Sequence, residues 1–415
     1  MRALTLSVLL IAWTVAGEEQ SAQSPIEFVR ADLKIKGSAP WAASAGDFNA
    51  DRLPDFAISN RESRDITVLT AQLFAPNPRF KPLLAVSKHV ALEMVGDSSK
   101  MFLRYKVVGR INTDAHNEGQ RLGDFNADGI LDLVVANGGT AAEEGRTVSV
   151  LLGQGEAVFR APKKYLVGTH PTSVSVADVN KDGRDDLVVT NRESRNISIL
   201  LGDGSGEFTA GATVPVVGGP QWSAAADLNK DGAADIITAN RRSNTVSVLM
   251  GNGDGTFEAA LDFTVGRAPS ACAVADLDED AIPDLIVANC GCSSGLPDNT
   301  ISVLKGRGNG TFAPQITYEA GDGPSAVAVA DFNRDGRPDV AVTNRGGYTS
   351  PGKTVSLLFG TAAGAFKKTA AVPVGSAPTG IEVTDVNGDF RPDLVVVNSM
   401  SNSLTFLMNR LPFTK

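Results

Sequence analysis

The sequence contains few of the residues from which catalytic sites are usually built. Only three histidines, His89, His116 and His170, and three cysteines occur among 415 residues. No G-x-S-x-G nucleophile motif appears in a strand-to-helix setting. The sequence offers no acid and base pair in separate environments, because most paired carboxylates fall in one repeated motif. We therefore do not expect an enzyme.

Basic charge and helical periodicity are also lacking. Acidic residues outnumber basic ones by 47 to 38, and the formal net charge is −9. Nucleic-acid phosphates need a basic face, so we expect no nucleic-acid partner. Apolar residues do not recur at helical spacing, which argues against a helical solenoid.

An apolar stretch long enough to span a membrane is absent. Arg2 precedes an apolar run from Leu4 to Ala16, which small and polar residues follow. This run is too short for a spanning helix and is typical of a secretory signal. We expect residues 1–17 to be a signal peptide and the mature chain to be a secreted monomer, extracellular or periplasmic. An uncleaved membrane anchor is the alternative.

Glycine, by contrast, is abundant, with 42 residues, and an acidic motif repeats along the chain. DVNKDGRDD begins at Asp178 and DFNRDGRPD at Asp331. Successive copies are separated by 77, 54, 49, 49, 55 and 54 residues. The seven copies begin at Asp47, Asp124, Asp178, Asp227, Asp276, Asp331 and Asp385.

Each copy is followed by the same series of short segments. An apolar run ending in Asn comes first, then a second alternating run, a Gly-rich turn, and an outer strand that ends near a Gly-x-x-Pro turn. Four short strands with glycine punctuation indicate one blade of a β-propeller. The sequence therefore predicts an all-β fold, a seven-bladed propeller of four-stranded antiparallel blades over residues 26–410.

The two ends of the chain carry complementary parts of one blade. Phe28 and Pro40 repeat the outer-strand spacing seen elsewhere, while residues 379–409 supply three strands and stop before the fourth. We expect the N-terminal strand to pair with the last C-terminal strand. Such closure hides the edges that otherwise promote aggregation.

The first repeat is longer than the others. The surplus, at about residues 72–104, alternates as a hairpin would, and we expect an extra hairpin on the outer edge of the first blade. A partner-binding surface and a decorated edge strand both remain open.

The acidic motif has the spacing of a cation-binding loop. Acids or Asn occupy its first, third, fifth and ninth positions, and oxygen ligands at alternate positions of a tight loop suit Ca²⁺. The loop is not an EF-hand, because its twelfth position lies inside a strand. Ordinary Asp, Asn and Gly turns are the alternative. The candidate ligands are Asp47, Asn49, Asp51, Asp55, Asp124, Asn126, Asp128, Asp132, Asp178, Asn180, Asp182, Asp186, Asp227, Asn229, Asp231, Asp235, Asp276, Asp278, Asp280, Asp284, Asp331, Asn333, Asp335, Asp339, Asp385, Asn387, Asp389 and Asp393.

We expect at least four and up to seven ions. Four copies have glycine at the sixth position, where the chain turns sharply. The other three place Arg52, Ala281 and Phe390 there, and we expect these loops to be distorted or weak.

With its motif D-x-[DN]-x-D-G-x-x-D and the apolar strand that follows, the chain resembles the FG-GAP and VCBS repeat proteins, whose calcium-loaded propellers are similar to the head of the integrin α subunit. The resemblance implies side-chain ligands at positions one, three, five and nine. It also implies a backbone carbonyl ligand at position seven.

The face opposite the metal loops carries the larger side chains. Exposed Trp and Arg around a depression suit a carbohydrate or protein ligand, although packing and solvated turns explain such residues equally well. The candidates are Trp41, Trp222, Arg192, Arg241 and Arg345. The rival function is a hydrolase or lyase near His116 and His170.

Two smaller features leave alternatives open. Asp114, His116 and Glu118 form either an extra metal site or a solvated loop. Cys272 enters the fifth motif and Cys290 follows the strand leaving it, so we predict a disulfide from Cys272, with Cys292 as the competing partner.

Overall fold

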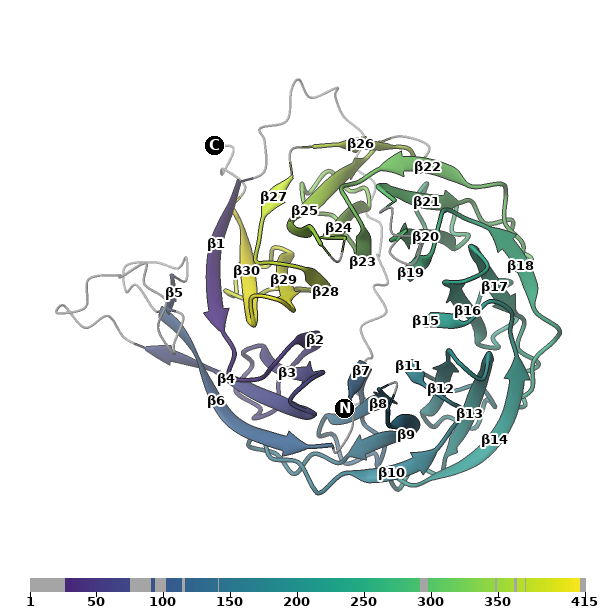
Figure 1. Ribbon diagram of the computed structural model, residues 1–415, viewed down its shortest axis with the longest axis horizontal. Coiled ribbons are helices and arrows are strands. Elements are labelled where there is room, and N and C mark those ends of the chain that lie inside the picture. Colours follow the sequence, from purple (N-terminus) through teal and green to yellow (C-terminus); the bar gives the residue numbers. More distant parts are fainter. Residues whose placement is uncertain are drawn as a thin grey trace.

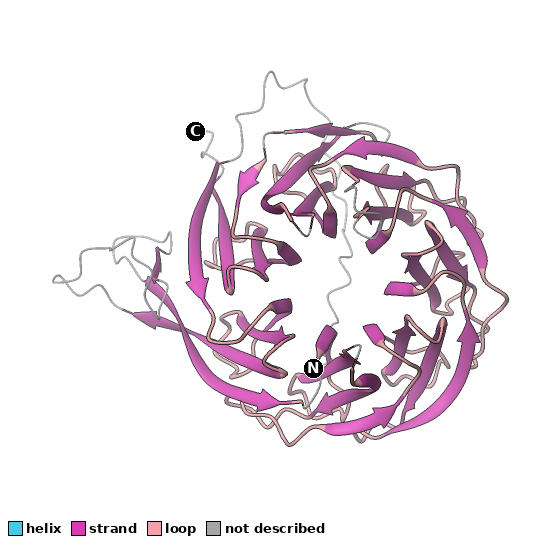
Figure 2. Cartoon of the chain, viewed as in Figure 1, coloured by secondary structure: helices cyan, strands magenta, loops and turns pink. Residues whose placement is uncertain are grey.

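The computed structural model describes residues 27–74, 91–93, 102–113, 116–140, 142–291, 298–347, 349–361, 364–369 and 371–410. The expected signal peptide, residues 1–17, lies outside them. All named elements are β-strands, arranged as seven antiparallel sheets around a central channel (Figures 1 and 2). Within the described ranges no helix is both long and apolar enough to cross a bilayer.

Each sheet is one blade, and its first strand lies nearest the channel (Figure 1). Blade one contains β2 (Pro40–Gly46), β3 (Asp55–Asn60), β4 (Asp65–Phe74), β6 (Phe102–Asn112) and β5 (Ala91–Glu93). Blade two contains β7 (Asn117–Gly123), β8 (Asp132–Gly139), β9 (Glu144–Leu151) and β10 (Lys163–Leu166). Blade three contains β11 (Pro171–Ala177), β12 (Asp186–Asn191), β13 (Asn196–Gly202) and β14 (Phe208–Pro215).

The remaining blades follow the same order. Blade four contains β15 (Pro220–Ala226), β16 (Asp235–Asn240), β17 (Thr245–Leu249) and β18 (Leu261–Thr264). Blade five contains β19 (Pro269–Ala275), β20 (Asp284–Asn289), β21 (Thr300–Leu304) and β22 (Ile316–Glu319). Blade six contains β23 (Pro324–Ala330), β24 (Asp339–Gly346), β25 (Pro351–Gly360), β26 (Phe366–Lys368) and β27 (Val372–Pro373). Blade seven contains β28 (Pro378–Thr384), β29 (Asp393–Asn398), β30 (Ser403–Arg410) and β1 (Glu27–Lys34).

The second strand of each blade is buried along its length, as the DLVVTN segment of β12 illustrates. Neighbouring blades cover both of its faces, so it reads as a continuous apolar run rather than an alternating one. The core is accordingly divided into layers between adjacent blades. In one layer Phe125 and Val134 of blade two pack with Leu187 and Val189 of blade three.

The expected ring closure is confirmed. β1 pairs with β30 in register from Glu27 opposite Arg410 to Lys34 opposite Ser403. Blade seven is thus completed by strands from both ends of the described chain, with β1 as its outermost strand (Figure 1).

The long first repeat extends blade one outward. β6 pairs with β4 as the fourth strand, and β5 pairs antiparallel with β6, with Ala91 opposite Arg104. Of the expected hairpin at about residues 72–104, the described residues show the short β5–β6 pairing. Residues 75–90 and 94–101 lie outside the described ranges.

Candidate metal loops and ligand-binding face

Each acidic motif forms the loop between the first and second strands of a blade. In blade three, Asp178 Oδ1 accepts a hydrogen bond from the backbone N–H of Asp182 at 3.1 Å, and Oδ2 accepts from Gly183 at 2.7 Å. Asn180 Oδ1 also accepts from Asp182, and Asp182 Oδ1 accepts from Arg184. These bonds fold the loop back on itself, so that its side-chain oxygens gather on one side.

The aspartate at position nine of each loop is the first residue of the buried second strand. Asp186 Oδ2 accepts from Val179 N–H at 3.0 Å and Oδ1 from Gly202 N–H at 2.8 Å. Burial, with the nearby charges of Asp182 and Asp178, raises the pKa of Asp186 to about 6. The same cause, burial, raises the pKa of the equivalent residues Asp55, Asp132, Asp235, Asp284, Asp339 and Asp393.

The three loops without glycine at position six are not distorted. Arg52, Ala281 and Phe390 adopt left-handed φ values of 68°, 64° and 60°. The backbone N–H of each still donates to the first aspartate, at 2.8, 2.8 and 2.7 Å. The expectation of distorted loops is therefore wrong for the backbone. The left-handed conformation costs a non-glycine residue about 1 kcal/mol or more.

The donor set suits a hard cation. Carboxylate and amide oxygens are the ligands Ca²⁺ prefers, and carboxylate oxygens of Asp276, Asp278 and Asp280 lie within 4.8 Å of one another. The side chains at positions one, three, five and nine of each loop would hold the ion. Its charge would stabilise the ionised form of the position-nine carboxylates, whose pKa values burial raises.

A repeated contact ties the inner strands together on the face opposite the metal loops. The hydroxyl of the second inner-strand residue donates to a carbonyl at the start of the next blade in four places: Thr172 to Pro220, Ser270 to Pro324, Ser325 to Pro378 and Thr379 to Trp41. In the other three blades this position holds Trp41, Glu118 and Gln221. At three positions of this face a larger side chain therefore replaces the structural hydroxyl.

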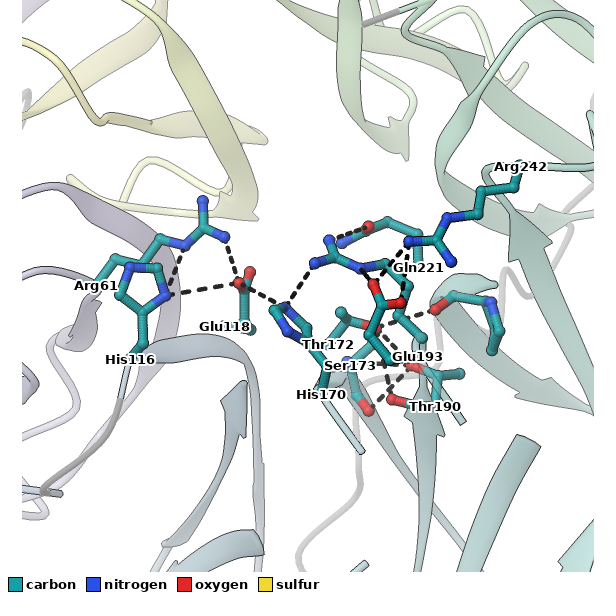
Figure 3. Close-up of polar contacts among 12 residues, drawn as sticks. Arg61, His116, Glu118, His170, Thr172, Ser173, Thr190, Glu193, Gln221 and Arg242 are labelled. Carbon is teal, nitrogen blue, oxygen red and sulfur yellow. Dashed lines mark hydrogen bonds and ion pairs between the residues drawn. The ribbon is translucent and has the colours of Figure 1, made fainter. Parts of the chain in front are cut away.

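Glu118 is the most unusual of these residues (Figure 3). Its side chain is fully buried, forms a close ion pair with Arg61, and lies with Oε1 3.8 Å from His116 Nδ1 and 3.7 Å from His170 Nε2. Oε2 has no hydrogen-bond partner among the described residues. Burial alone would raise the pKa of Glu118, but the Arg61 guanidinium outweighs it and holds the pKa well below its usual range.

Gly138 leaves room for this carboxylate, and Gly119 lets the strand that carries it approach the backbone of blade three. A Cβ on Gly138 would lie 2.7 Å from Glu118 Cγ, and one on Gly119 would lie 2.9 Å from the Thr172 carbonyl oxygen in blade three. Gly138 occupies the position after the second-strand Asn, where blades one and three have Arg61 and Arg192. The local sequence of blade two is thus fitted to Glu118.

The arginines also fix the histidines. Arg61 Nε donates to His116 Nδ1 at 3.1 Å, and Arg192 Nη2 lies 2.8 Å from His170 Nε2. A guanidinium can only donate, so both of these ring nitrogens are acceptors. His170 has a left-handed φ of 55°, a conformation that histidine tolerates better than most residues. The expected alternative of a solvated loop is wrong for Glu118, and Asp114 lies outside the described residues.

Of the predicted ligand-face residues, Trp41, Trp222, Arg241 and Arg345 line the central channel, and Arg192 is not among its lining residues. Arg61, Arg192, Arg241 and Arg345 occupy equivalent positions in blades one, three, four and six, each with its N–H bonded to the residue before the inner-strand proline. The Arg61 and Arg345 guanidinium carbons lie 4.1 and 5.5 Å from the Trp41 ring centroid. Trp222 instead contacts Arg121, at 4.7 Å. Among the predicted arginines, Arg345 therefore lies beside Trp41.

The channel is a cavity of about 1720 Å³. Trp41, Trp222, Arg241 and Arg345 are among its lining residues, and alanines of the inner strands leave it open. The sequence reasoning missed Glu118 as a buried carboxylate, together with Gln221 and Arg121. These residues could have been found as large side chains at inner-strand positions where other blades have small ones. The difference becomes visible only when the seven repeats are aligned on one another.

The predicted cysteine pairing is wrong. Cys272 is a free, buried thiol, and burial raises its pKa to about 12. Cys290 is disulfide-bonded, and its competing partner Cys292 lies outside the described residues. The register explains the difference, because Cys272 faces Val287 across the β19–β20 pair while Cys290 lies beyond the end of β20.

Comparisons with known proteins agree with the fold. The FG-GAP-like repeat matches residues 124–189, 178–238, 227–287 and 292–342, more than half of the chain, and the FG-GAP repeat matches residues 323–365. The comparison with curated proteins gave no match.

Solved structures show similarity at the level of fold. A structure of BBS1N in complex with ARL6DN has 12% identity and a TM-score of 0.59, covering 95% of this chain and 99% of that one. A functionally unknown protein from Desulfotomaculum acetoxidans has 14% identity and a TM-score of 0.54, covering 85% and 92%. A putative 6-phosphogluconolactonase from Bacteroides fragilis has 12% identity and a TM-score of 0.54, covering 89% and 94%.

Proposed function

The chain belongs to the FG-GAP-like repeat family, and from this premise we propose that it is a secreted binding module. In this proposal Ca²⁺ in the metal loops stabilises the ring, and the arginine-rich face holds an acidic ligand. Support for the first part comes from seven loops with the same backbone and oxygen donors. Calcium, when bound, would neutralise carboxylates that otherwise repel one another.

The ring of arginines carries the second part of the proposal. The chain as a whole is acidic, with a net charge of −9, yet four arginines occupy equivalent positions on one face. Guanidinium groups bind carboxylate, sulfate and phosphate groups through paired hydrogen bonds. An acidic ligand would therefore meet positive charge at this face and repulsion over the carboxylate-rich loops of the other.

The shape of the site favours an acidic carbohydrate. A concave cavity with a few convergent polar groups is typical of small-ligand sites, whereas stable protein interfaces bury about 800 Å² per partner on broader surfaces. Trp41 and Trp222 line the cavity beside the arginines. An aromatic ring can pack against a sugar face while arginine binds its acidic group.

Calorimetric binding of uronic-acid or sulfated oligosaccharides, with a neutral oligosaccharide and an acidic peptide of matched length, tests this proposal. The double variant Arg241→Gln and Arg345→Gln should weaken binding of the acidic sugar at least about tenfold, since each lost charged hydrogen bond contributes about 1.5–3 kcal/mol. Arg160→Gln is the matched control, because Arg160 is exposed and follows the Gly-rich turn of blade two.

Three results would count against the proposal. Equal binding of neutral and acidic sugars would rule out charge recognition. Equal losses in the double variant and in Arg160→Gln would place the ligand elsewhere. Tighter binding of the acidic peptide than of the sugar would favour a protein ligand.

A second candidate, a hydrolase or lyase, rests on one observation. Glu118 is fully buried between His116 and His170 and has an oxygen without a hydrogen-bond partner in the described structure. A group of this kind can accept a proton or a ligand hydroxyl. Turnover of an acidic oligosaccharide that Glu118→Gln abolishes, while binding persists, would favour the enzyme. Binding without turnover favours the binding module.

A further inference from the structure

The fifth metal loop differs from the other six in its charges. The third position of this loop is Asp278, where every other copy has Asn. Lys305 directly follows β21, the third strand of the same blade. Lys305 Nζ lies 2.7 Å from Asp284 Oδ2 and 3.1 Å from Asp278 Oδ2. An extra carboxylate and an extra ammonium therefore occur together in a single loop.

Packing does not require a lysine at this position. The equivalent residues in blades two, three and four are Leu152, Leu201 and Met250. They pack beneath a glycine of the next blade's turn, and a Cβ on Gly206 would lie 2.8 Å from Leu152. Lys305 packs beneath Gly364 in the same way. An apolar side chain would fit there, so the ammonium is a specific feature of the fifth loop.

Lys305 donates to a carboxylate oxygen whose counterpart in the third loop accepts one hydrogen bond fewer. In loop three, Asp186 Oδ2 accepts only the N–H of Val179. In loop five, Asp284 Oδ2 accepts both the N–H of Leu277 and Lys305 Nζ. The ninth carboxylate is a cation ligand in our proposal, and Lys305 already binds the oxygen that such a ligand would use.

We propose that Lys305 is a built-in competitor for Ca²⁺, so that the fifth loop binds the ion more weakly than the others and keeps its shape without it. This inference rests on the proposed calcium role of the loops. An ammonium that shares two carboxylates with a divalent cation repels it strongly at such short range. Lys305 Nζ lies within reach of both Asp284 and Asp278, and a lysine ammonium is positively charged at neutral pH.

The fifth loop also has unused capacity. Asp278 Oδ1 is buried and has no hydrogen-bond partner in the described structure. Without the lysine, four carboxylates would face the same space, since Asp276, Asp278 and Asp280 already lie close together and Asp284 joins them. Removal of Lys305 should therefore turn the weakest loop of the ring into one of the strongest.

The test is a Ca²⁺ titration of the metal-free protein, followed by hydrogen exchange of the peptide that covers each loop. In the wild type, we expect the peptide over 276–284 to gain protection only at a Ca²⁺ concentration at least about tenfold above that of the other loops. Lys305→Leu, which copies blades two and three, should move this midpoint to the level of the other loops or below. Met250→Leu changes the same position of blade four without a charge and should move nothing.

A reciprocal variant keeps the test independent of how Lys305→Leu folds. Met250→Lys brings an ammonium to the fourth loop and should raise the Ca²⁺ midpoint of the peptide over 227–235 severalfold. A fifth-loop midpoint equal to the others in the wild type, or one that stays in place in Lys305→Leu, overturns the inference while the calcium proposal stands. If no loop responds to Ca²⁺, the calcium proposal fails and this inference fails with it.

Discussion

Single residues on the ligand face carry charges that the fold has to compensate. Glu118 is the clearest case, because a fully buried carboxylate is tolerated only with partners that replace its hydration. Arg61 is that partner, through its close ion pair with the carboxylate. Glu193, by comparison, forms its ion pair with Arg242 at a side-chain exposure of 38%, where solvent screens the attraction.

We predict that Glu118→Gln lowers the free energy of unfolding by about 3 kcal/mol at pH 7, because it leaves buried positive charge unpaired. The folded pKa of Glu118 lies below its ordinary value of about 4.3. Its carboxylate therefore stabilises the fold above that pH, and this contribution is lost as the pH falls toward the folded pKa. Urea denaturation at pH 7 and pH 3 should show the gap between wild type and variant narrowing in acid.

Glu193→Gln is the control, and we expect it to cost at most about 1 kcal/mol. A loss as small as this for Glu118→Gln, or a gap that widens in acid, would contradict the account of the buried carboxylate.

The acidic loops were predictable from the sequence, whereas the Glu118 cluster was not. The candidate ligands of a loop lie within nine consecutive residues, so their spacing is visible in the chain. Arg61, Glu118 and His170 come from three blades and meet only because the ring brings their turns together. Glu118 is conspicuous only against the hydroxyls that other blades place at its position.

Among the structural elements, the loop of blade seven carries a removable strain. Phe390 has a φ of 60° and its side chain is 88% exposed, so it bears the cost of the left-handed conformation without gaining buried area. Replacing it with glycine should raise the free energy of unfolding by about 1 kcal/mol, while Phe390→Ala should not. Denaturant titration of the two variants checks this. A gain from alanine equal to that from glycine would remove backbone strain as the cause.

The closing strand is the element on which the ring depends most directly. β1 supplies the fourth strand of blade seven and packs Leu33 and Phe28 into the layers on either side. Deleting residues 27–34 should expose the edge of β30 and lower the melting temperature sharply or cause aggregation. Thermal melting with light scattering measures both. A deletion variant that melts like the intact chain would show that the closure does not stabilise the ring.

Strand order and closure were predictable because each repeat has turn residues at the same places. In addition, the C-terminal blade lacks its fourth strand, and the N-terminal segment supplies one. The cysteine pairing was not, because it depends on register near the end of β20. Cys272 lies on β19 opposite Val287 of β20, whereas Cys290 follows the end of β20. A shift of a few residues along a hairpin decides whether two thiols can meet.

At the scale of the whole molecule, we propose that Ca²⁺ stabilises the propeller at several places around the ring. Metal sites in extracellular modules bind Ca²⁺ with Kd values on the order of 10⁻⁴–10⁻³ M. A tenfold excess of ion then adds about 1.4 kcal/mol per site. Six sites of this strength would contribute about 8 kcal/mol, which is comparable to the whole stability of a typical domain.

The most direct measurement is calorimetric titration of the metal-free protein with Ca²⁺, paired with thermal melting before and after chelation. We predict at least four sites and a steep fall in melting temperature when the ion is removed. The first carboxylates of the loops provide a check, because Asp178→Ala should remove one site and leave the others filled. A stoichiometry of zero or one, or a melting temperature that chelation leaves unchanged, would contradict the proposed calcium role and show that the seven motifs are ordinary turns.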